Sequence, residues 1–370
     1  MVRWLPTALT LLLLLATFGS VQSVAQDLLP EVPSTPEQDS LIAIGVHWHD
    51  RKDYDEAIEF YKKALQKNPA NTIALYELAY SQYEKGEKEE ALQTAMEGTR
   101  YRSQMLPQLY MVIANIHDDQ GEPEKAVEIY QEALAASPDF FLLHYNLGLT
   151  FARMSRGKEA EASFQQALRL YPFHPSSHMA LAQLWMARGL HAPALMAYTH
   201  FLILEGGTER AQQAAAVVEE IITGRINQKN NEKNKIYLSG SSDTSEGNFQ
   251  LQEGALALMG HLNKLLDSAL VDSVGAYRTD LDKYIKNIRA AVDLVAEAAE
   301  KNPVATSFTQ QFYLPWYSEI VRLNHVQAFC HLVAANSMIP GAESWLTEHQ
   351  KEVKAFANWM KEYRPVKPIK

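Results

Sequence analysis

The chain has 370 residues, of which 47% are hydrophobic and 21% are charged. This composition can fill a sizeable core and excludes a chain that is disordered throughout, and the length allows two domains or one extended array. The formal net charge of −10 disfavours nucleic acid as a partner, because phosphates are bound by clustered Lys and Arg.

Residues 1–25 have the pattern of a secretory signal peptide. Arg3 supplies the positive charge, the apolar run extends from Leu9 to Phe18, and small residues at Ser23-Val24-Ala25 suit signal peptidase. We expect cleavage after about Ala25, with an uncleaved N-terminal anchor as the alternative. No later segment has about 18 unbroken apolar residues, so we expect no membrane span in the mature chain.

The cysteine content bears on the compartment. Cys330 is the single cysteine, which excludes an internal disulfide. An export signal without disulfides favours a bacterial periplasmic or secreted protein. Residues 26–37 read as an N-terminal linker.

A repeat with a period of 34 to 35 residues follows. Five alanines mark it: Ala57, Ala91, Ala126, Ala160 and Ala194. An aromatic residue usually stands four positions later, at Tyr61, Tyr130, Phe164 and Tyr198, and is replaced by Ala95 in the second unit. A proline that would end the second helix of a unit stands at Pro69, Pro138 and Pro172. In the first half of each unit a small residue recurs at Gly45, Ala79, Ala114, Gly148 and Ala182.

This pattern resembles the tetratricopeptide repeat, a helix-turn-helix unit of 34 residues. The resemblance covers about residues 38–208 as five units. It implies an all-α superhelix in which each unit buries its apolar face against its neighbours and leaves a concave face. Thr208 is a plausible N-cap and Gly224 a plausible C-cap of a helix that closes the array, so we place the array with its capping helix at 38–224.

The remainder divides into a polar loop or linker at 225–248 and a C-terminal helical module at 249–370. The pattern predicts helices near 250–269, 279–301, 307–336 and 341–363, with Pro303 and Pro340 at the breaks. The module vaguely resembles the C-terminal parts of uncharacterised secreted bacterial repeat proteins.

The resemblance also implies a binding surface, because the first helix of each unit lines the concave face. Tyr76, Tyr80 and Tyr83 form a stripe at i, i+4 and i+7. Counting from the repeat phase, His49 and Asp118 face the same side. The predicted partner-binding groove is lined by Ile42, Val46, Tyr76, Tyr80, Tyr83, Met111, Asn115, Tyr145, Leu149, Met179, Gln183 and Met186.

The predicted groove is aromatic, aliphatic and rich in methionine, with almost no Lys or Arg. Family members that bind chaperones use a Lys, Arg and Asn clamp for a terminal carboxylate, and Ile42 and Val46 stand where its first Lys and Asn would be. We therefore expect the groove to bind an apolar or helical protein segment rather than an anionic one. The alternative is a groove already filled by the chain's own C-terminal helices.

Metal and catalytic sites are weakly indicated. His47 and His49 in "HWHD" lie on nearly opposite faces of a helix, so we expect Trp48 in the core, surface histidines and no metal. Cys330 with His325 or His331 is the best nucleophile candidate, but it lacks an evident acid and reads better as a small core residue. No cofactor motif is present.

These observations predict a non-enzymatic interaction scaffold or adaptor in the bacterial cell envelope. Two alternatives stay open: an enzyme whose active site lies in the C-terminal module, and a scaffold whose groove is filled in cis.

Overall fold

A computed structural model of the protein is almost wholly helical, which confirms the expected all-α class. The predicted signal peptide lies outside the described residues, as do the linker at 225–248 and, apart from two residues, the helix expected at 250–269. The structure describes residues 28–223, 252, 256, 280–301 and 307–364.

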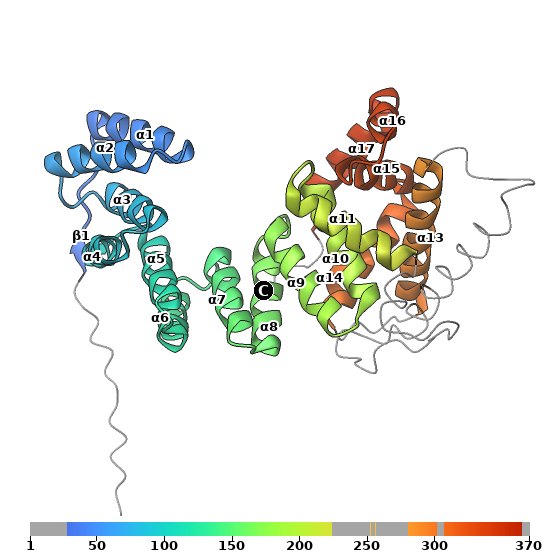
Figure 1. The fold of residues 1–370 in the computed structure, drawn as a ribbon, viewed down its shortest axis with the longest axis horizontal. Coiled ribbons are helices and arrows are strands. Elements are labelled where there is room, and N and C mark those ends of the chain that lie inside the picture. The colour runs from blue at the N-terminus through green and yellow to red at the C-terminus, as the bar shows by residue number, and fades with distance from the viewer. Residues whose placement is uncertain (1–27, 224–251, 253–255, 257–279, 302–306, 365–370) are drawn as a thin grey trace, which may run out of the picture.

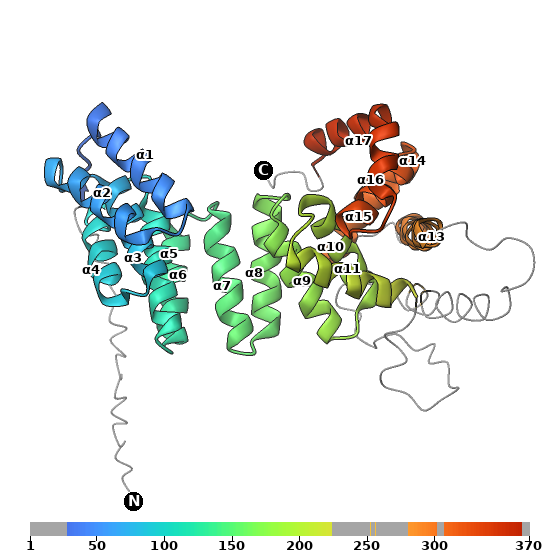
Figure 2. The same ribbon diagram turned by 45° about the horizontal axis from the view of Figure 1, so that its top comes forward.

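Residues 36–222 form a stack of helix pairs followed by one closing helix, and the pairs lie side by side along a curved array (Figures 1 and 2). Pairs α1/α2 to α9/α10 correspond to the five predicted units, and α11 follows them. The helices are α1 (Pro36–Asp50), α2 (Tyr54–Lys67), α3 (Thr72–Lys85), α4 (Lys88–Gly98), α5 (Leu106–Asp119), α6 (Pro123–Ala136), α7 (Phe141–Arg153), α8 (Gly157–Leu170), α9 (Pro175–Ala187), α10 (His191–Leu204) and α11 (Glu209–Ile222).

Small residues explain how the two helices of a unit approach each other. A Cβ added at Gly45 would lie 2.5 Å from Cε1 of Tyr61, and one added at Gly148 would lie 2.6 Å from Cε1 of Phe164. The aromatic ring of the second helix thus rests on the backbone of the first. The repeat alanines are fully buried for the same reason: Ala57, Ala91, Ala126, Ala160 and Ala194.

The second unit keeps its packing although it lacks the aromatic residue. Leu109 of α5 approaches Gly98 so closely that an added Cβ would lie 2.7 Å from its Cδ2. Leu109 and Ala95 are both fully buried. A side chain from the third unit therefore occupies space next to the short alanine, and the stack continues.

Residues 28–35, expected as a linker, bind across the first two units. β1 (Leu29–Pro30) pairs in parallel with β2 (Tyr101–Arg102). Asn68 Nδ2 donates to the carbonyl of Val32 at 3.2 Å, and Asn71 Nδ2 donates to Ser34 Oγ at 3.0 Å. This stretch is a strap that ties the start of the array to the α4–α5 connection.

At the end of the array, Thr208 caps α11 as predicted, because its Oγ1 accepts from the N–H of Ala211 at 3.1 Å. The expected C-cap, Gly224, lies outside the described residues. None of the helices that the structure describes is long and apolar enough to cross a membrane.

The C-terminal module contains more helices than the sequence predicted. The single helix expected at 307–336 is two, because Asn324 takes the left-handed conformation with φ +59°, which ends a helix. The helix expected at 341–363 is also two, because His349 between them is not helical (φ −109°, ψ 35°). The described helices are α13 (Asp280–Lys301), α14 (Phe308–Arg322), α15 (Val326–Asn336), α16 (Ala342–Glu348) and α17 (Gln350–Glu362).

This module docks against the last unit, chiefly on α10, whose residues from 192 to 202 are all buried. The hydroxyls of Tyr317 and Thr199 are hydrogen-bonded, and Tyr317 also donates to the carbonyl of Met196 at 3.2 Å. Asn336 donates its amide to the carbonyl of Leu202. Figure 1 shows α13 and α14 beside α10 at one end of the array. An apolar helix that would otherwise be exposed is thereby enclosed.

Candidate partner-binding groove

The first helices of the units, α1, α3, α5, α7 and α9, carry the predicted groove residues on one face. Ile42 and Met179 are exceptions and belong to the core, with 7% and 8% of their surface exposed. Ile42 packs in one cluster with Ala74 and Leu78 of the next unit, which closes over it. The others keep exposed surface, and we call them the groove residues: Val46, Tyr76, Tyr80, Tyr83, Met111, Asn115, Tyr145, Leu149, Gln183 and Met186.

The part of the groove formed by α1 and α3 is aromatic. The rings of Tyr76 and Tyr80 stack with an interplanar angle of 4° and centroids 5.9 Å apart. His49 lies 4.9 Å from the ring of Tyr80 and 5.3 Å from that of Tyr54. The predicted tyrosine stripe is therefore a continuous half-buried surface, and burial is the main cause that raises the pKa of Tyr76 and Tyr80.

The candidate metal ligands have other roles. His47 is exposed and its ring lies edge-on to Trp48, which packs against the core of the first unit. His49 Nδ1 lies 2.7 Å from Ser81 Oγ of α3, so this histidine links two units.

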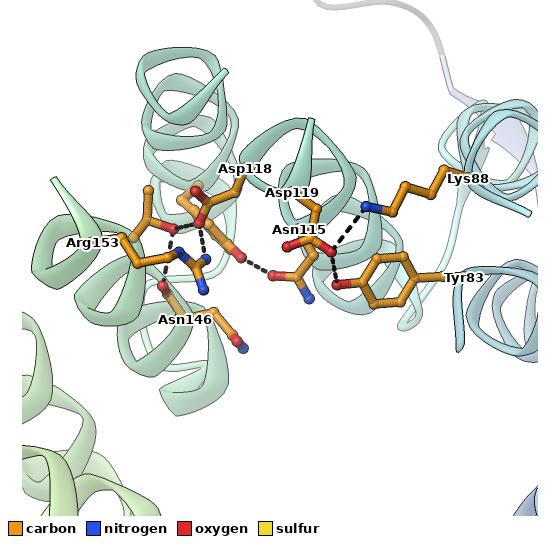
Figure 3. Close-up of polar contacts among 9 residues, drawn as sticks. Tyr83, Lys88, Asn115, Asp118, Asp119, Asn146 and Arg153 are labelled. Atoms are coloured by element: carbon orange, nitrogen blue, oxygen red, sulfur yellow. Dashed lines mark hydrogen bonds and ion pairs between the residues drawn. The ribbon is translucent and has the colours of Figure 1, made fainter. Parts of the chain in front are cut away.

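Polar contacts connect the first helices of the second, third and fourth units (Figure 3). The hydroxyl of Tyr83 on α3 donates to Asp119 Oδ2 of α5 at 2.8 Å, and Lys88 Nζ lies 3.5 Å from the same oxygen. Asp118 of α5 accepts from the Thr150 hydroxyl of α7 at 2.5 Å and forms an ion pair with Arg153. These bonds cross from one unit to the next.

In the same region the hydroxyl of the aromatic residue of the third unit, Tyr130, has a hydrogen-bond partner. Tyr130 donates its hydroxyl to Asn115 Oδ1, so Asn115 is held in place (Figure 3). Asn146 Nδ2 donates to the carbonyl of Leu142 at 2.9 Å and lies 3.1 Å from Met111 Sδ. The middle of the groove is thus more polar than the sequence suggested.

We call Tyr83, Asp118, Asp119, Thr150 and Arg153 the inter-repeat polar contacts. Sequence reasoning placed Asp118 on the inner face but did not pair it with Arg153. A signal was present, because both lie near the end of a first helix and are 35 residues apart, one repeat length. Such residues on neighbouring units lie next to each other in a stack.

The part of the groove formed by α7 and α9 is again aromatic. Tyr145 lies edge-on to the ring of His174 at 4.7 Å, and Phe141 lies 5.1 Å from the same ring and 4.8 Å from that of Tyr171. Tyr171 is 43% exposed. Burial lowers the pKa of His174 to about 4, with a smaller contribution from Arg210, so its ring is neutral and apolar in character.

The candidate nucleophile is a core residue. Cys330 is fully buried, and burial raises the pKa of its thiol, the opposite of what a nucleophilic thiolate needs. His325 packs against Phe356 and Trp359, whereas the ring of His331 stacks on Trp345 at 3.8 Å. Both histidines are engaged with aromatic rings rather than with the thiol.

Among the described residues, the C-terminal helices pack on the array mainly through α10 and α11, which carry no groove residue. Their hydrogen bonds to the array go to residues such as His178, Thr199 and Leu202, none of which is a groove residue. Tyr145, Leu149 and Met186 pack against a hydrophobic cluster that also includes residues of α13–α17, whereas Tyr76 and Tyr80 pack against the cluster of the second and third units.

Stacked antiparallel helix pairs that repeat every 34 to 35 residues and present their first helices on one face define a helical-repeat protein. Models of the tetratricopeptide repeat family match residues 49–116, 111–175 and 145–199. Residues 49–199 therefore consist of tetratricopeptide repeats. The family supports a general role as a scaffold for protein–protein interaction.

The chain is similar to several individual proteins. Tetratricopeptide repeat protein 21A of Mus musculus is 30% identical over 134 residues, which are 35% of this chain and 10% of that protein, so the chain spans about a tenth of its length. A thermophilic tetratricopeptide repeat protein of Thermus thermophilus is 27% identical, with 49% of this chain and 99% of that chain covered and a TM-score of 0.44. The pilF protein of Pseudomonas aeruginosa is 18% identical, with 64% and 93% covered and a TM-score of 0.44.

Proposed function

We propose that the array holds a segment of another protein in the groove and that this segment is mainly apolar. The observation that supports the proposal is the row of partly exposed aromatic, aliphatic and methionine side chains along α3, α5, α7 and α9, whereas the described C-terminal helices pack mainly on α10 and α11. Each apolar anchor contributes roughly 1.5–3 kcal/mol when buried, so three or four anchors suffice for micromolar binding after entropic losses.

We further propose that the protein acts in the bacterial cell envelope. The charged start, the apolar run and the Ser23-Val24-Ala25 site support export, and a single cysteine suits a chain that needs no disulfide. In this role the C-terminal module completes the array by enclosing α10 and presents a separate surface for a second partner.

The groove is tested by affinity capture from envelope extract with the mature chain and two variants. Leu149→Glu places a charge in the groove, whereas Met96→Glu places the same charge on α4, where Met96 is 56% exposed. We expect Leu149→Glu to abolish capture of the bound protein and Met96→Glu to leave it unchanged, with both variants folded by circular dichroism. Equal capture by all three proteins would refute groove binding.

A further inference from the structure

The first two units contain a group of acidic and aromatic side chains that an apolar groove does not explain. Glu77 of α3 is half-buried and lies on the same helical face as Tyr80 and Glu84, at i, i+3 and i+7. Asp50, at the end of α1, is close enough for its charge to act on Glu77. Tyr76 and Tyr80 stack on each other, and the ring of His49, the neighbour of Asp50 in sequence, lies 4.9 Å from that of Tyr80, so the end of α1 meets the middle of α3 here.

Within the described residues these carboxylates have no cationic partner. The ion pairs of the first two units involve other acids: Lys85 pairs with Asp55 at 2.5 Å and with Glu87 at 2.6 Å. Arg51 lies 4.0 Å from Asp53 and over the ring of Trp48. Lys85 and Arg51 are thus engaged elsewhere, and the exposed Lys52 forms no ion pair with a described residue.

The free protein therefore holds Glu77 in an unfavourable environment. Burial, with a smaller contribution from the charge of Asp50, raises the pKa of Glu77 to about 7. A half-buried carboxylate without a counter-charge is costly unless a partner supplies one.

A second polar group at the same place is poorly satisfied. Tyr61 is fully buried, and its hydroxyl makes no well-formed hydrogen bond with a described residue, although Ser81 lies near it. In the third unit the equivalent Tyr130 donates to Asn115, but the residue that matches Asn115 in the first unit is Val46, which cannot accept. Burial is the main cause that raises the pKa of Tyr61, and the charges of Glu77 and Asp50 add to it.

The charge of the surrounding helices points the same way. α1 contains Glu37, Asp39 and Asp50 but no Lys or Arg. α5 likewise has no Lys or Arg, although its Asp118 and Asp119 are already paired with Arg153 and Lys88. An aromatic surface with unpaired carboxylates is complementary to an ammonium or guanidinium group, which gains both ion pairing and contact with aromatic faces.

We propose that the Glu77 site, formed by Asp50, Tyr76, Glu77 and Tyr80, binds a Lys or Arg side chain of the partner segment. The inference rests on the proposed function, since it assigns a chemical character to one end of the segment held in the groove. The segment then has a basic residue over the first two units and apolar residues over the third to fifth, where Tyr145 and Leu149 lie. Because the groove changes character along its length, this arrangement also fixes the direction in which the segment binds.

The test uses peptides selected from a phage library of random twelve-residue sequences against the full mature chain. Selected peptides are synthesised, and their Kd is measured for the wild type, for Glu77→Gln and for Glu59→Gln. Glu59 is an exposed acid on α2 of the neighbouring first unit, so it controls for net charge. We expect the peptides to contain Lys or Arg, Glu77→Gln to weaken binding at least tenfold, and Glu59→Gln to change it less than twofold.

A peptide in which Lys is replaced by norleucine, or Arg by citrulline, completes the cycle. The modified peptide should bind the wild-type protein at least tenfold more weakly than the parent peptide does. The two peptides should bind Glu77→Gln equally well. Glu77→Gln should not lower the melting temperature, because it removes an unpaired carboxylate. A lower melting temperature together with unchanged Kd would mean that Glu77 is structural and would overturn the proposal.

The outcomes separate this inference from the proposed function. Peptides that lose binding in Leu149→Glu but not in Glu77→Gln, or that lack Lys and Arg, would refute the Glu77 site and keep the groove. Failure to select any peptide whose binding depends on Leu149 would refute both.

Discussion

At the scale of single residues, the array depends on close approaches that only small side chains permit. Gly148 is the clearest case, because the ring of Phe164 lies directly on its Cα, and Gly45 has the same relation to Tyr61. In a core packed this closely, a larger side chain forces its neighbours out of their preferred conformations, because no free space is left for it.

Gly148→Leu should therefore destabilise the protein by about 1–3 kcal/mol, more than substitutions of the groove residues do. Gly157→Ala is the matched control, because a Cβ at Gly157 would meet nothing within 4 Å. Chemical denaturation of both variants measures the difference. If Gly148→Leu unfolds at the wild-type midpoint, the repeat register is wrong.

The inter-repeat polar contacts act at the same scale. Arg153→Ala leaves the Asp118 carboxylate, whose side chain is 3% exposed, with Thr150 as its remaining partner. We expect the free energy of unfolding to fall by about 1–2 kcal/mol. This is less than for a fully buried ion pair, because Arg153 is itself half exposed. Arg322→Ala removes an exposed ion pair with Glu319 and should cost less than about 0.5 kcal/mol. Equal effects of the two substitutions in urea unfolding would show that the Asp118 pair is not structural.

At the scale of elements, the contact between α9, α10 and α14 is aromatic and contains two buried histidines. His178 Nδ1 lies 2.7 Å from the Tyr313 hydroxyl, and its Nε2 lies 2.9 Å from the carbonyl of Pro172. The ring of His200 stacks on His178 at 5.2 Å and lies 4.3 Å from that of Trp316. Burial lowers the pKa of His178 to about 4 and that of His200 well below its usual value.

Docking of the C-terminal module should consequently weaken in acid. The folded state favours the neutral form of His178, so the contribution of this residue to the free energy of unfolding is complete above pH 6.5. About 3 kcal/mol of that free energy is lost as the pH falls from 6.5 to 4. The groups around it, His174, His200 and Tyr313, add no negative charge that would offset this. His178→Gln should make stability depend less steeply on pH in this window, whereas His47→Gln, at an exposed position, should not. Denaturant titrations at pH 7, 5.5 and 4.5 give the free energy of unfolding at each pH. The same change of this free energy with pH in the wild type and in His178→Gln would contradict the prediction.

The elements also show what the sequence could and could not reveal. The repeat phase predicted the helix pairs, because small and aromatic residues recur at fixed positions that packing requires, and it put most of the predicted groove residues at positions that keep exposed surface. The break at Asn324 and the position of His349 were missed, since a single residue leaving the helical conformation does not alter the hydrophobic pattern. The Asp118–Arg153 pair was missed because it depends on how neighbouring units stack. Ile42 and Met179 were misplaced because burial between units is not set by the phase of one helix.

At the scale of the whole molecule, the array and the C-terminal module divide the surface between them. The module encloses α10 at one end, the strap of residues 28–35 ties the other end, and the groove residues keep exposed surface between them. Both ends of a repeat array need such cover, because a terminal unit has a neighbour on one side only.

Export is a prediction at this scale. If residues 1–25 direct secretion, the protein recovered from the periplasm or medium of an expressing bacterium should begin at about Gln26. N-terminal sequencing measures this directly. Retention of Met1 on a membrane-bound product would refute both the cleavage and the proposed location.

Hydrogen–deuterium exchange of the full mature chain, with and without a bound peptide from the selection, tests most directly whether partners bind in the groove. The groove account predicts slower exchange on binding in α3, α5, α7 and α9, with α13–α17 unchanged. Protection confined to α13–α17, or to the second helices of the units, with none in α3, α5, α7 and α9, would contradict this prediction.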